Sequence, residues 1–427
     1  MQGDTYTSLP LRLVLLALGA FLAISPASAQ VTETVLNDFT GASGSQVFSG
    51  LTFDSSGNLY GTTASGGLGS GTVYELSPAV GGGWTETVLY KFGSKSGDGA
   101  DPYGGVVFDA TGHLYGTTKV GGTHSKGTLY RLTHLSGGGW SESVLHNFGG
   151  GKDGANPLAT PVIDPAGNLY GTTYYGGTNV NCTAAGKTYS CGTVYELSSA
   201  GVYGVIHDFS SVSDGYFPVA GITPDSSGNL YGQTTYGGIY GGGLLFELSP
   251  SNGTWTEAAI HPWGRVNDGR PDGAQCYGTL VFDNSGHMWG TSLVGGTHGD
   301  MGTVFKFTKN GPGWAESSVH GFGEPGDGAS PYSGLVVDSE GNLFGTTTLG
   351  GASGEGTVYE IIPLETGYDY ELLYSFTGLT DGRMAAAPMI LDGLGNLYGT
   401  TMWGGNSAHC TKSEGCGVVF EISGATD

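Results

Sequence analysis

Positive charge is scarce in this sequence. It contains 14 Lys and Arg against 37 Asp and Glu, which gives a formal net charge of −23. A protein that binds nucleic acid needs a basic surface to neutralise phosphates, and this composition does not supply one. We therefore exclude nucleic acid as a partner.

Long hydrophobic runs are also missing. The main apolar run extends from Leu13 to Ile24, and at about 12 residues it is shorter than the roughly 20 that a membrane-spanning helix needs. Arg12 precedes the run, and residues 26–29 (Pro-Ala-Ser-Ala) follow it as a small-residue cleavage site. We predict a signal peptide over residues 1–29, no membrane span after its cleavage, and a secreted or periplasmic location.

Helical periodicity is absent after residue 30, whereas glycine is abundant at 83 residues. Glycine permits the backbone angles that tight turns require, so a chain with so many glycines is expected to contain many short strands. Disorder is the alternative for a glycine-rich chain, but 11% aromatic residues and many Val, Leu and Ile indicate a packed core. We expect an all-β protein.

The phrase Gly-Asn-Leu-Tyr-Gly-Thr-Thr recurs in seven related copies spaced by 54 to 61 residues. The copies are centred on residues 57–63, 112–118, 167–173, 228–235, 286–292, 341–347 and 395–401. Because a carboxylate can accept backbone N–H groups and glycine tolerates positive φ, we interpret the Asp-x-x-Gly that begins each copy as a structural turn. The turn aspartates are Asp54, Asp109, Asp164, Asp225, Asp283, Asp338 and Asp392.

Each repeat predicts four strands, because an apolar run, the Leu-Tyr-Gly-Thr-Thr segment and two further β-type segments follow one another. Four antiparallel strands per repeat fit a β-propeller blade. The seventh repeat stops after its third strand at 417–422, whereas residues 32–36 have the sequence of the fourth-strand residues 85–89. We therefore predict a single domain over 30–427. It is a seven-bladed β-propeller, closed by the N-terminal strand, which completes the last blade and removes the open edges.

The recurring G-N-L-Y-G-T-T…G-G…G-T-V-Y-E-L unit resembles the Gloeo/Verruco (GloVer) tandem repeat family of exported bacterial proteins. The resemblance extends over nearly the whole chain after residue 30. It implies export from a bacterium, and it carries no catalytic signature that could be assigned to particular positions.

Residues present in nearly every repeat are expected to be structural, because an active site is needed only once. An aspartate stands eleven residues before six of the turn aspartates, and Ser43 takes its place in the first repeat. These carboxylates are either a ring of cation or sugar ligands or the acceptors of a stabilising hydrogen bond at each blade junction, and we favour the second reading. They are Asp98, Asp153, Asp214, Asp272, Asp327 and Asp381.

Four histidines occupy one position in successive repeats: His146, His207, His261 and His320. On outermost strands their rings would lie about 15 Å apart, which is too far for the ~2 Å bonds to a shared metal ion. Tyrosine fills the same position in two other repeats, so we predict aromatic packing there, no metal site and no cofactor. His124 and His298 lie in distant repeats and are not expected to act together.

Three loops depart from the repeat, in repeats three and seven and at the start of repeat five. All three are expected on the face where the loops between the second and third strands open. An exported chain meets an oxidising compartment, so we predict local disulfides Cys182–Cys191 and Cys410–Cys416. Cys276 is then either buried or paired with another chain, and the sequence nominates no base that would make it a catalytic thiol.

Aromatic and basic residues accompany these loops. Aromatic rings beside hydrogen-bonding groups suit sugars, whose faces are apolar and whose edges are polar; the alternative is that the rings only pack between loops. The candidate ligand-binding residues are Tyr174, Tyr175, Tyr236, Tyr240, Trp403, Arg265 and Arg270.

We therefore expect an exported binding or scaffold propeller that recognises a glycan or another surface molecule, such as a surface protein, on its loop face. The first alternative is an extracellular polysaccharide hydrolase or lyase with its site on the same face. As a glycosidase it would need two carboxylates about 5–9.5 Å apart, and the sequence nominates no catalytic residue. The second alternative is a purely structural envelope protein. The oligomeric state is left open.

Overall fold

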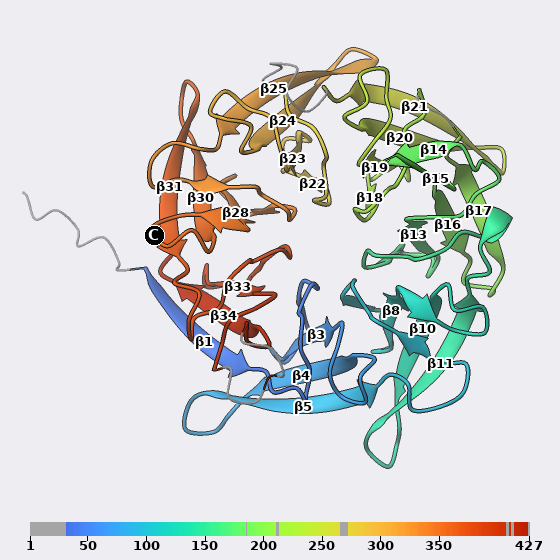
Figure 1. Ribbon diagram of the computed structural model, residues 1–427, viewed down its shortest axis with the longest axis vertical. Coiled ribbons are helices and arrows are strands. Elements are labelled where there is room, and N and C mark those ends of the chain that lie inside the picture. The colour runs from blue at the N-terminus through green and yellow to red at the C-terminus, as the bar shows by residue number, and fades with distance from the viewer. Residues whose placement is uncertain are drawn as a thin grey trace, which may run out of the picture.

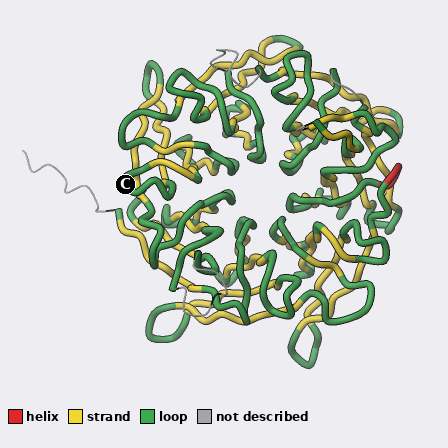
Figure 2. The backbone as a smooth tube through the Cα atoms, viewed as in Figure 1, coloured by secondary structure: helices red, strands yellow, loops and turns green. Residues whose placement is uncertain are grey.

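Seven four-stranded antiparallel sheets form a ring in the computed structural model, which describes residues 31–184, 186–210, 213–264, 272–406, 410 and 414–425 (Figure 1). Each sheet is one blade, with its first strand nearest the centre and its fourth strand at the periphery. Strands and loops make up almost all of the described chain (Figure 2). The predicted seven-bladed β-propeller is confirmed, while the predicted signal peptide lies outside the described residues.

The strands of each blade are given from the centre to the periphery. Blade one contains β2 (Thr52–Phe53), β3 (Leu59–Thr63), β4 (Thr72–Pro78) and β5 (Trp84–Lys91). Blade two contains β7 (Val106–Phe108), β8 (Leu114–Thr118), β10 (Thr128–His134) and β11 (Trp140–Asn147). Blade three contains β12 (Val162–Ile163), β13 (Leu169–Thr173), β16 (Thr193–Leu197) and β17 (Tyr203–Asp208). Blade four contains β18 (Thr223–Pro224), β19 (Leu230–Thr234), β20 (Leu244–Ser251) and β21 (Thr254–Pro262).

The remaining blades have the same order. Blade five contains β22 (Val281–Phe282), β23 (Met288–Ser292), β24 (Thr303–Asn310) and β25 (Gly313–Gly321). Blade six contains β27 (Val336–Val337), β28 (Leu343–Thr347), β30 (Thr357–Pro363) and β31 (Tyr368–Ser375). Blade seven contains β32 (Ile390–Leu391), β33 (Leu397–Thr400), β34 (Val418–Ser423) and β1 (Thr32–Asp38).

The N-terminal strand β1 closes the ring. It pairs antiparallel with β34, with Thr32 opposite Ser423 and Asp38 opposite Val418, and Figure 1 shows the two strands side by side. The pairing shifts by one residue between Val35 and Asn37, as it does in the outer strand of all six other blades. β1 is therefore the fourth strand of blade seven, and the predicted closure is confirmed.

Each turn between the first and second strands is built around its aspartate. The Oδ1 atom of Asp164 accepts the backbone N–H groups of Ala166 at 2.9 Å and Asn168 at 2.8 Å. Its Oδ2 atom accepts the Asn168 side-chain amide at 2.8 Å. Because these partners lie within four residues of the aspartate, the local sequence is sufficient to specify the turn.

The glycine of each Leu-Tyr-Gly-Thr-Thr strand is covered by an aromatic ring from the third strand of its blade. A Cβ atom added to Gly116 would stand 2.4 Å from the Oη atom of Tyr130, closer than real Cβ contacts are found. Glycine is required here because the ring lies directly against the backbone. The equivalent rings of the other blades are fully buried: Tyr74, Tyr195, Phe246, Phe305, Tyr359 and Phe420.

Non-glycine residues with left-handed backbone recur at one position of every repeat. Asn156 shows the reason: its N–H donates to the Lys126 carbonyl of the preceding blade at 2.8 Å, and its carbonyl accepts the Tyr174 N–H of its own blade at 3.1 Å. Gln46 makes the same link to Cys416 at 3.0 Å, where the ring closes. The strained conformation is offset by hydrogen bonds that join neighbouring blades. The seven residues, with φ between 54° and 61°, are Gln46, Asp101, Asn156, Phe217, Gln275, Ser330 and Met384.

We call the face that carries these segments, together with the loops between second and third strands, the loop face. Short ladders join the two kinds of segment in two blades: β6 (Gly99–Ala100) with β9 (Val120–Gly121), and β26 (Gly328–Ala329) with β29 (Leu349–Gly350). Blade three adds a hairpin of β14 (Cys182–Ala184) and β15 (Lys187–Tyr189), and a 3-10 turn, η1 (Gly151–Asp153), precedes this blade. Within the described ranges, no helix has the length and apolar character to cross a membrane.

Candidate ligand-binding site

Backbone pairing holds the loop face together. Ala155 pairs with Tyr175, and Arg383 pairs with Trp403. Each pair joins the segment that enters a blade to the loop between the second and third strands of the same blade. The two kinds of loop therefore lie side by side on one face, as the repeat predicted.

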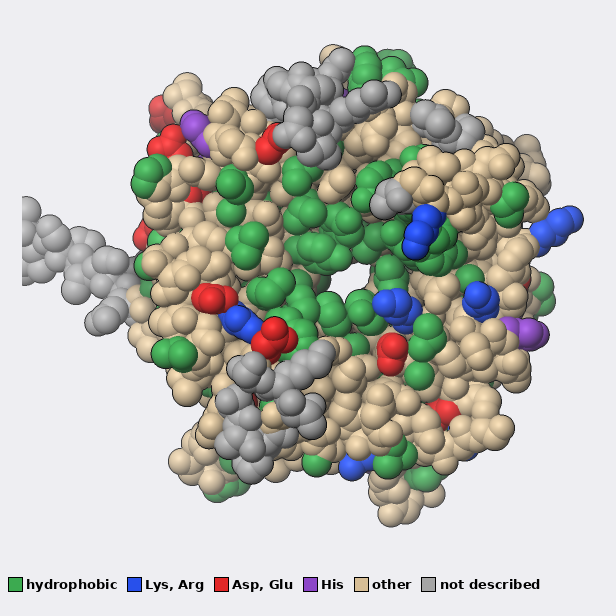
Figure 3. Space-filling model, in the orientation of Figure 1, with side chains coloured by type: hydrophobic (Ala, Val, Ile, Leu, Met, Phe, Trp, Pro, Cys, Tyr) green, Lys and Arg blue, Asp and Glu red, His purple; other side chains and the backbone are tan. Residues whose placement is uncertain are grey.

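A cavity of about 480 Å³ opens at the centre of the ring. Every blade contributes to its wall the residue six positions before its turn aspartate. The residue before each of these is directed into the blade interface; Val47 and Cys276, for example, are fully buried. Figure 3 shows apolar side chains collected around the central opening. The wall residues at this position are Phe48, Tyr103, Leu158, Val219, Tyr277, Tyr332 and Ala386.

Two pairs of stacked aromatic rings stand in this wall, each formed across a blade interface. The centroids of Phe48 and Tyr103 lie 4.3 Å apart with planes 11° from parallel. Those of Tyr277 and Tyr332 lie 4.5 Å apart at 22°. The remaining blades place only aliphatic residues at this position, so the cavity has aromatic surface on some sides and not on others.

Tyrosine hydroxyls gather around the same opening. Burial, followed by the neighbouring Tyr103, raises the pKa of Tyr332 to about 12. Burial is also the main cause that raises the pKa of Tyr277, with further contributions from Tyr332, Tyr236 and Tyr174. These hydroxyls are therefore protonated at neutral pH and can both donate and accept hydrogen bonds.

Among the described wall residues, the cation is Lys119. It lies in the loop after β8, and its Nζ atom stands 4.1 Å from the centroid of the Tyr103 ring. The described residues of the wall include no aspartate or glutamate. In a protein with a net charge of −23, the described wall of this cavity therefore lacks the acidic side chains that predominate in the chain as a whole, although the Asp101 carboxylate interacts with Lys119.

Only some of the predicted ligand-binding residues lie at the cavity. Tyr174 and Tyr175 line the cavity. Tyr236 stacks on Tyr216 with centroids 6.0 Å apart and contributes to the raised pKa of Tyr277. Tyr240 and Trp403 belong to loops of the same face but not to the cavity wall, and Arg265 and Arg270 lie outside the described residues.

The cavity wall also contains residues that were not among those predicted: Phe48, Tyr103, Tyr277, Tyr332 and Lys119. One signal could have revealed the four rings. The residue type varies among the repeats at the position six residues before the turn aspartate, whereas the positions beside it vary less. Lys119 could have been found in the same way, because it occupies the position of Tyr174 in the preceding repeat.

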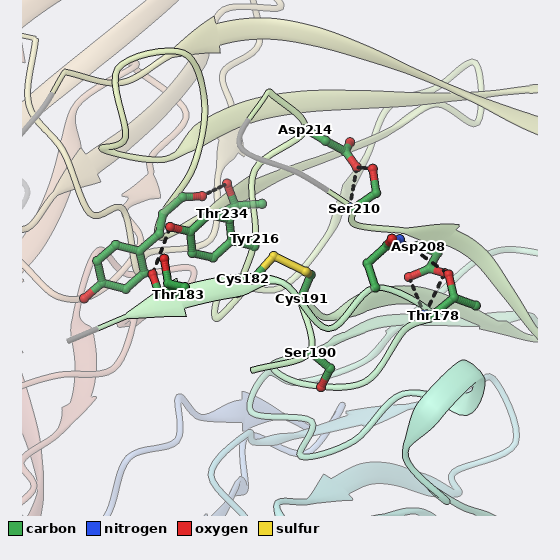
Figure 4. Close-up of a disulfide and its surroundings, with 12 residues drawn as sticks. Thr178, Cys182, Thr183, Ser190, Cys191, Asp208, Ser210, Asp214, Tyr216 and Thr234 are labelled. Carbon is green, nitrogen blue, oxygen red and sulfur yellow. Dashed lines mark hydrogen bonds between the residues drawn. A yellow bond between two sulfur atoms is a disulfide. The ribbon is translucent and has the colours of Figure 1, made fainter. Parts of the chain in front are cut away.

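Both predicted disulfides are present. Cys182–Cys191 closes the β14–β15 hairpin (Figure 4), and Cys410–Cys416 closes the corresponding loop of blade seven. Cys276 is fully buried among apolar residues that include Trp263 and Phe305. Burial raises the pKa of its thiol well above the ordinary value, which supports a core residue over a reactive thiol.

The aspartates of the blade junctions are acceptors for the outer strand of the preceding blade. The Nε2 atom of His146 lies 2.9 Å from Asp153 Oδ1. The Tyr374 hydroxyl donates to Asp381 in the equivalent place at 3.0 Å. Three further histidines contact a junction aspartate in the same way: His207, His261 and His320. Among the described residues, no group of three or more His, Cys, Asp or Glu is placed to hold a metal ion.

The sequence pattern of the family described as the Gloeobacter/Verrucomicrobia repeat matches residues 17–185, 70–270, 143–335 and 263–427. No curated protein matches the sequence. Among solved structures, a candidate 6-phosphogluconolactonase from Bacteroides uniformis is 13% identical, with 80% of this chain and 88% of that chain covered and a TM-score of 0.51. A luciferin-regenerating enzyme is 12% identical, with coverage of 92% and 95% and a TM-score of 0.44. These likenesses concern the fold alone.

Proposed function

This chain belongs to the Gloeobacter/Verrucomicrobia repeat family, and from that premise we propose that it is an exported binding propeller whose central cavity on the loop face holds a carbohydrate. The repeats supply a rigid ring, and the residues that vary at one repeat position supply the site. Two local disulfides accord with an oxidising, extracytoplasmic location.

The observation that carries this proposal is the composition of the cavity wall. Stacked aromatic pairs provide flat apolar surface for the C–H faces of a sugar ring. Protonated tyrosine hydroxyls, together with Asn156 and Thr160, provide hydrogen bonds for its hydroxyl groups. The volume of about 480 Å³ falls in the range of roughly 300–1,000 Å³ that small-ligand sites occupy.

Binding is favoured over hydrolysis by the same wall. A glycosidase positions two carboxylates on either side of the scissile bond, and the described wall residues supply hydroxyl, amide and ammonium groups instead. A purely structural role in the envelope is less well supported, because it would not require the seven equivalent wall positions to differ as they do.

The proposal is tested with an array of oligosaccharides, followed by calorimetric titration of the best ligand. Tyr332→Ala and Tyr103→Ala are each expected to lower affinity by about tenfold or more, which corresponds to ~1.4 kcal/mol. Tyr368→Ala is the matched control, because Tyr368 begins the outer strand β31 and contacts Lys306 rather than the cavity. Absence of binding to every carbohydrate, or binding that neither cavity variant weakens, would overturn the proposal.

A further inference from the structure

We propose that the ligand is an acidic oligosaccharide that leaves the central cavity along a groove over blades two and three and ends on the disulfide-closed hairpin β14–β15. The inference rests on the proposed carbohydrate function and specifies the chemical class and the path of the ligand. The groove is defined by Lys119, Asn156, Tyr175, Lys126 and Tyr189.

The groove adjoins the cavity. A second hollow of about 440 Å³ is lined by Lys126, Tyr189 and Ser190, and it shares Asn156 and Tyr175 with the central cavity. Asn156 also fixes the loop that bears both lysines, because its Nδ2 donates to the Lys119 carbonyl at 2.9 Å and its N–H donates to the Lys126 carbonyl at 2.8 Å. A ligand that fills the cavity therefore needs only to cross Asn156 and Tyr175 to reach the second hollow.

The loops along this path are basic in an otherwise acidic protein. Segments 119–127, 148–160 and 174–192 carry four of the 14 basic residues of the chain. The carboxylates near them are Asp101, which interacts with Lys119, and Asp153, which accepts a hydrogen bond from His146. Figure 3 shows Lys and Arg side chains on the side of the opening where blades two and three lie. The basic residues are Lys119, Lys126, Lys152 and Lys187.

An acidic ligand is the class that this charge distribution selects. A net charge of −23 repels polyanions from most of the surface, so a local excess of lysine provides both attraction and a defined place of binding. Neutral glycans would gain no charge–charge attraction from these lysines. Carboxylate and sulfate groups can both satisfy them, and the experiment below separates the two.

Aromatic surface accompanies the charge along the groove. Tyr175 stacks on Tyr189 of the hairpin, with centroids 5.2 Å apart and planes 18° from parallel. Sugar units beyond the cavity would therefore meet apolar ring surface as well as lysine ammonium groups, as the alternation of apolar faces and charged edges in an acidic oligosaccharide requires.

The hairpin that carries Tyr189 is held in place at several points (Figure 4). The Cys182–Cys191 disulfide closes it, and the Tyr216 hydroxyl donates to the Thr183 carbonyl at 3.1 Å. At its base, the Gly176 N–H donates to Ser190 Oγ at 2.7 Å. A surface fixed in this way binds a ligand without a further loss of conformational entropy.

Calorimetric titration of the purified protein with galacturonate trimer and hexamer tests the proposal. The hexamer is expected to bind more tightly than the trimer, and its fully methyl-esterified form, which carries no carboxylate charge, is expected to lose that advantage. A sulfated hexasaccharide identifies sulfate as the recognised group if it binds more tightly than the galacturonate hexamer.

Variants locate the groove. Lys126→Gln removes one exposed charge of the groove and should weaken hexamer binding by between about 1.4-fold and 5-fold, since an exposed ion pair contributes ~0.2–1 kcal/mol. Trimer binding should stay unchanged, and Tyr189→Ala should show the same selectivity. Lys309→Gln is the matched control, because Lys309 is exposed at the end of β24 beside Trp314.

Equal affinity for trimer and hexamer, or for the hexamer and its methyl ester, would overturn the proposal while leaving the carbohydrate function of the cavity intact. An effect of Lys309→Gln as large as that of the groove variant would also overturn it. The loss of any lysine would then weaken binding, whether or not that lysine lies in the groove. If no carbohydrate bound at all, acidic or neutral, the proposed function itself would fail.

Discussion

Phe48 and Tyr103 stack with their ring centroids 4.3 Å apart, although they belong to different blades. Tyr277 and Tyr332 repeat this relationship across the interface of blades five and six. Both pairs occupy a position that the repeat leaves free to vary, directly after residues that are buried in the interface. A uniform scaffold thus carries a non-uniform cavity, and the asymmetry is what gives the ring a defined site.

Removal of residues 31–39 should open the ring. β1 forms six residue pairs with β34, and each lost ladder hydrogen bond contributes ~0.5–1.5 kcal/mol, so we expect the free energy of unfolding to fall by at least about 3 kcal/mol. Chemical denaturation measures the change. The control is a circular permutant in which a copy of residues 79–83 joins Ser423 to Thr32 and the chain begins in the β4–β5 turn. It should be as stable as the natural order, and an unchanged stability of the truncated chain would contradict closure.

Gly116→Ala should destabilise the protein. The new Cβ atom would meet Tyr130 Oη at 2.4 Å, and overpacking of this kind costs about 1–3 kcal/mol. Thermal unfolding measures the loss. Because the clash is with the Tyr130 ring, Gly116→Ala should cost less stability when it is added to the Tyr130→Leu variant than when it is added to the natural sequence. Equal destabilisation in the presence and absence of the Tyr130 ring would show that the ring is not the cause.

Stability should fall as the pH rises through the carboxyl groups of the outer strands. Burial, followed by the charge of Asp381, raises the pKa of Glu33 to about 7. The unfolded chain releases this proton near pH 4.5, whereas the folded chain keeps it up to about pH 7. The contribution of Glu33 is therefore fully present below about pH 4.5 and lost by about pH 7.

Glu33→Gln keeps the side chain neutral and should flatten the decline of stability between pH 5 and 8, as followed by denaturation at each pH. Glu365→Gln, at an exposed position in the β30–β31 turn, serves as the control. An unchanged slope in the Glu33 variant would show that this carboxyl group does not titrate in the range given.

Thiol titration without reductant should detect no reactive cysteine in the folded protein and one after unfolding. Four of the five cysteines form disulfides, and Cys276 is fully buried with a raised thiol pKa. A thiol that reacts at once in the folded state would contradict this burial. More than one thiol after unfolding would contradict the disulfide pairing.

The ring of blades could be predicted from the sequence alone. The reason is that the turn at Asp164, like its equivalents, is specified by residues within four positions of the aspartate. Closure was equally visible, since residues 32–36 duplicate residues 85–89. Cys182–Cys191 and Cys410–Cys416 were visible because both bridges are local. In each case the determining residues are neighbours in the chain or copies of one another.

The cavity wall could not be derived in the same way. Tyr103 stands between the buried Pro102 and the buried Gly104. Its side chain faces the opening because the ring places this segment near the central axis, which the local sequence does not reveal. Left-handed backbone at Asn156 was equally hidden, because a following proline favours extended backbone. Hydrogen bonds to two neighbouring blades, which exist only once those blades are packed together, accompany it.

The central claim is that the cavity on the loop face holds the ligand, and a crystal structure of the protein with its best-binding oligosaccharide tests it most directly. We expect density for a sugar ring in contact with Tyr103 or Tyr332, with an acidic group beside Lys119. A ligand bound on the opposite face, for example against Asp338 and Asp392 at the turns of blades six and seven, would contradict the account.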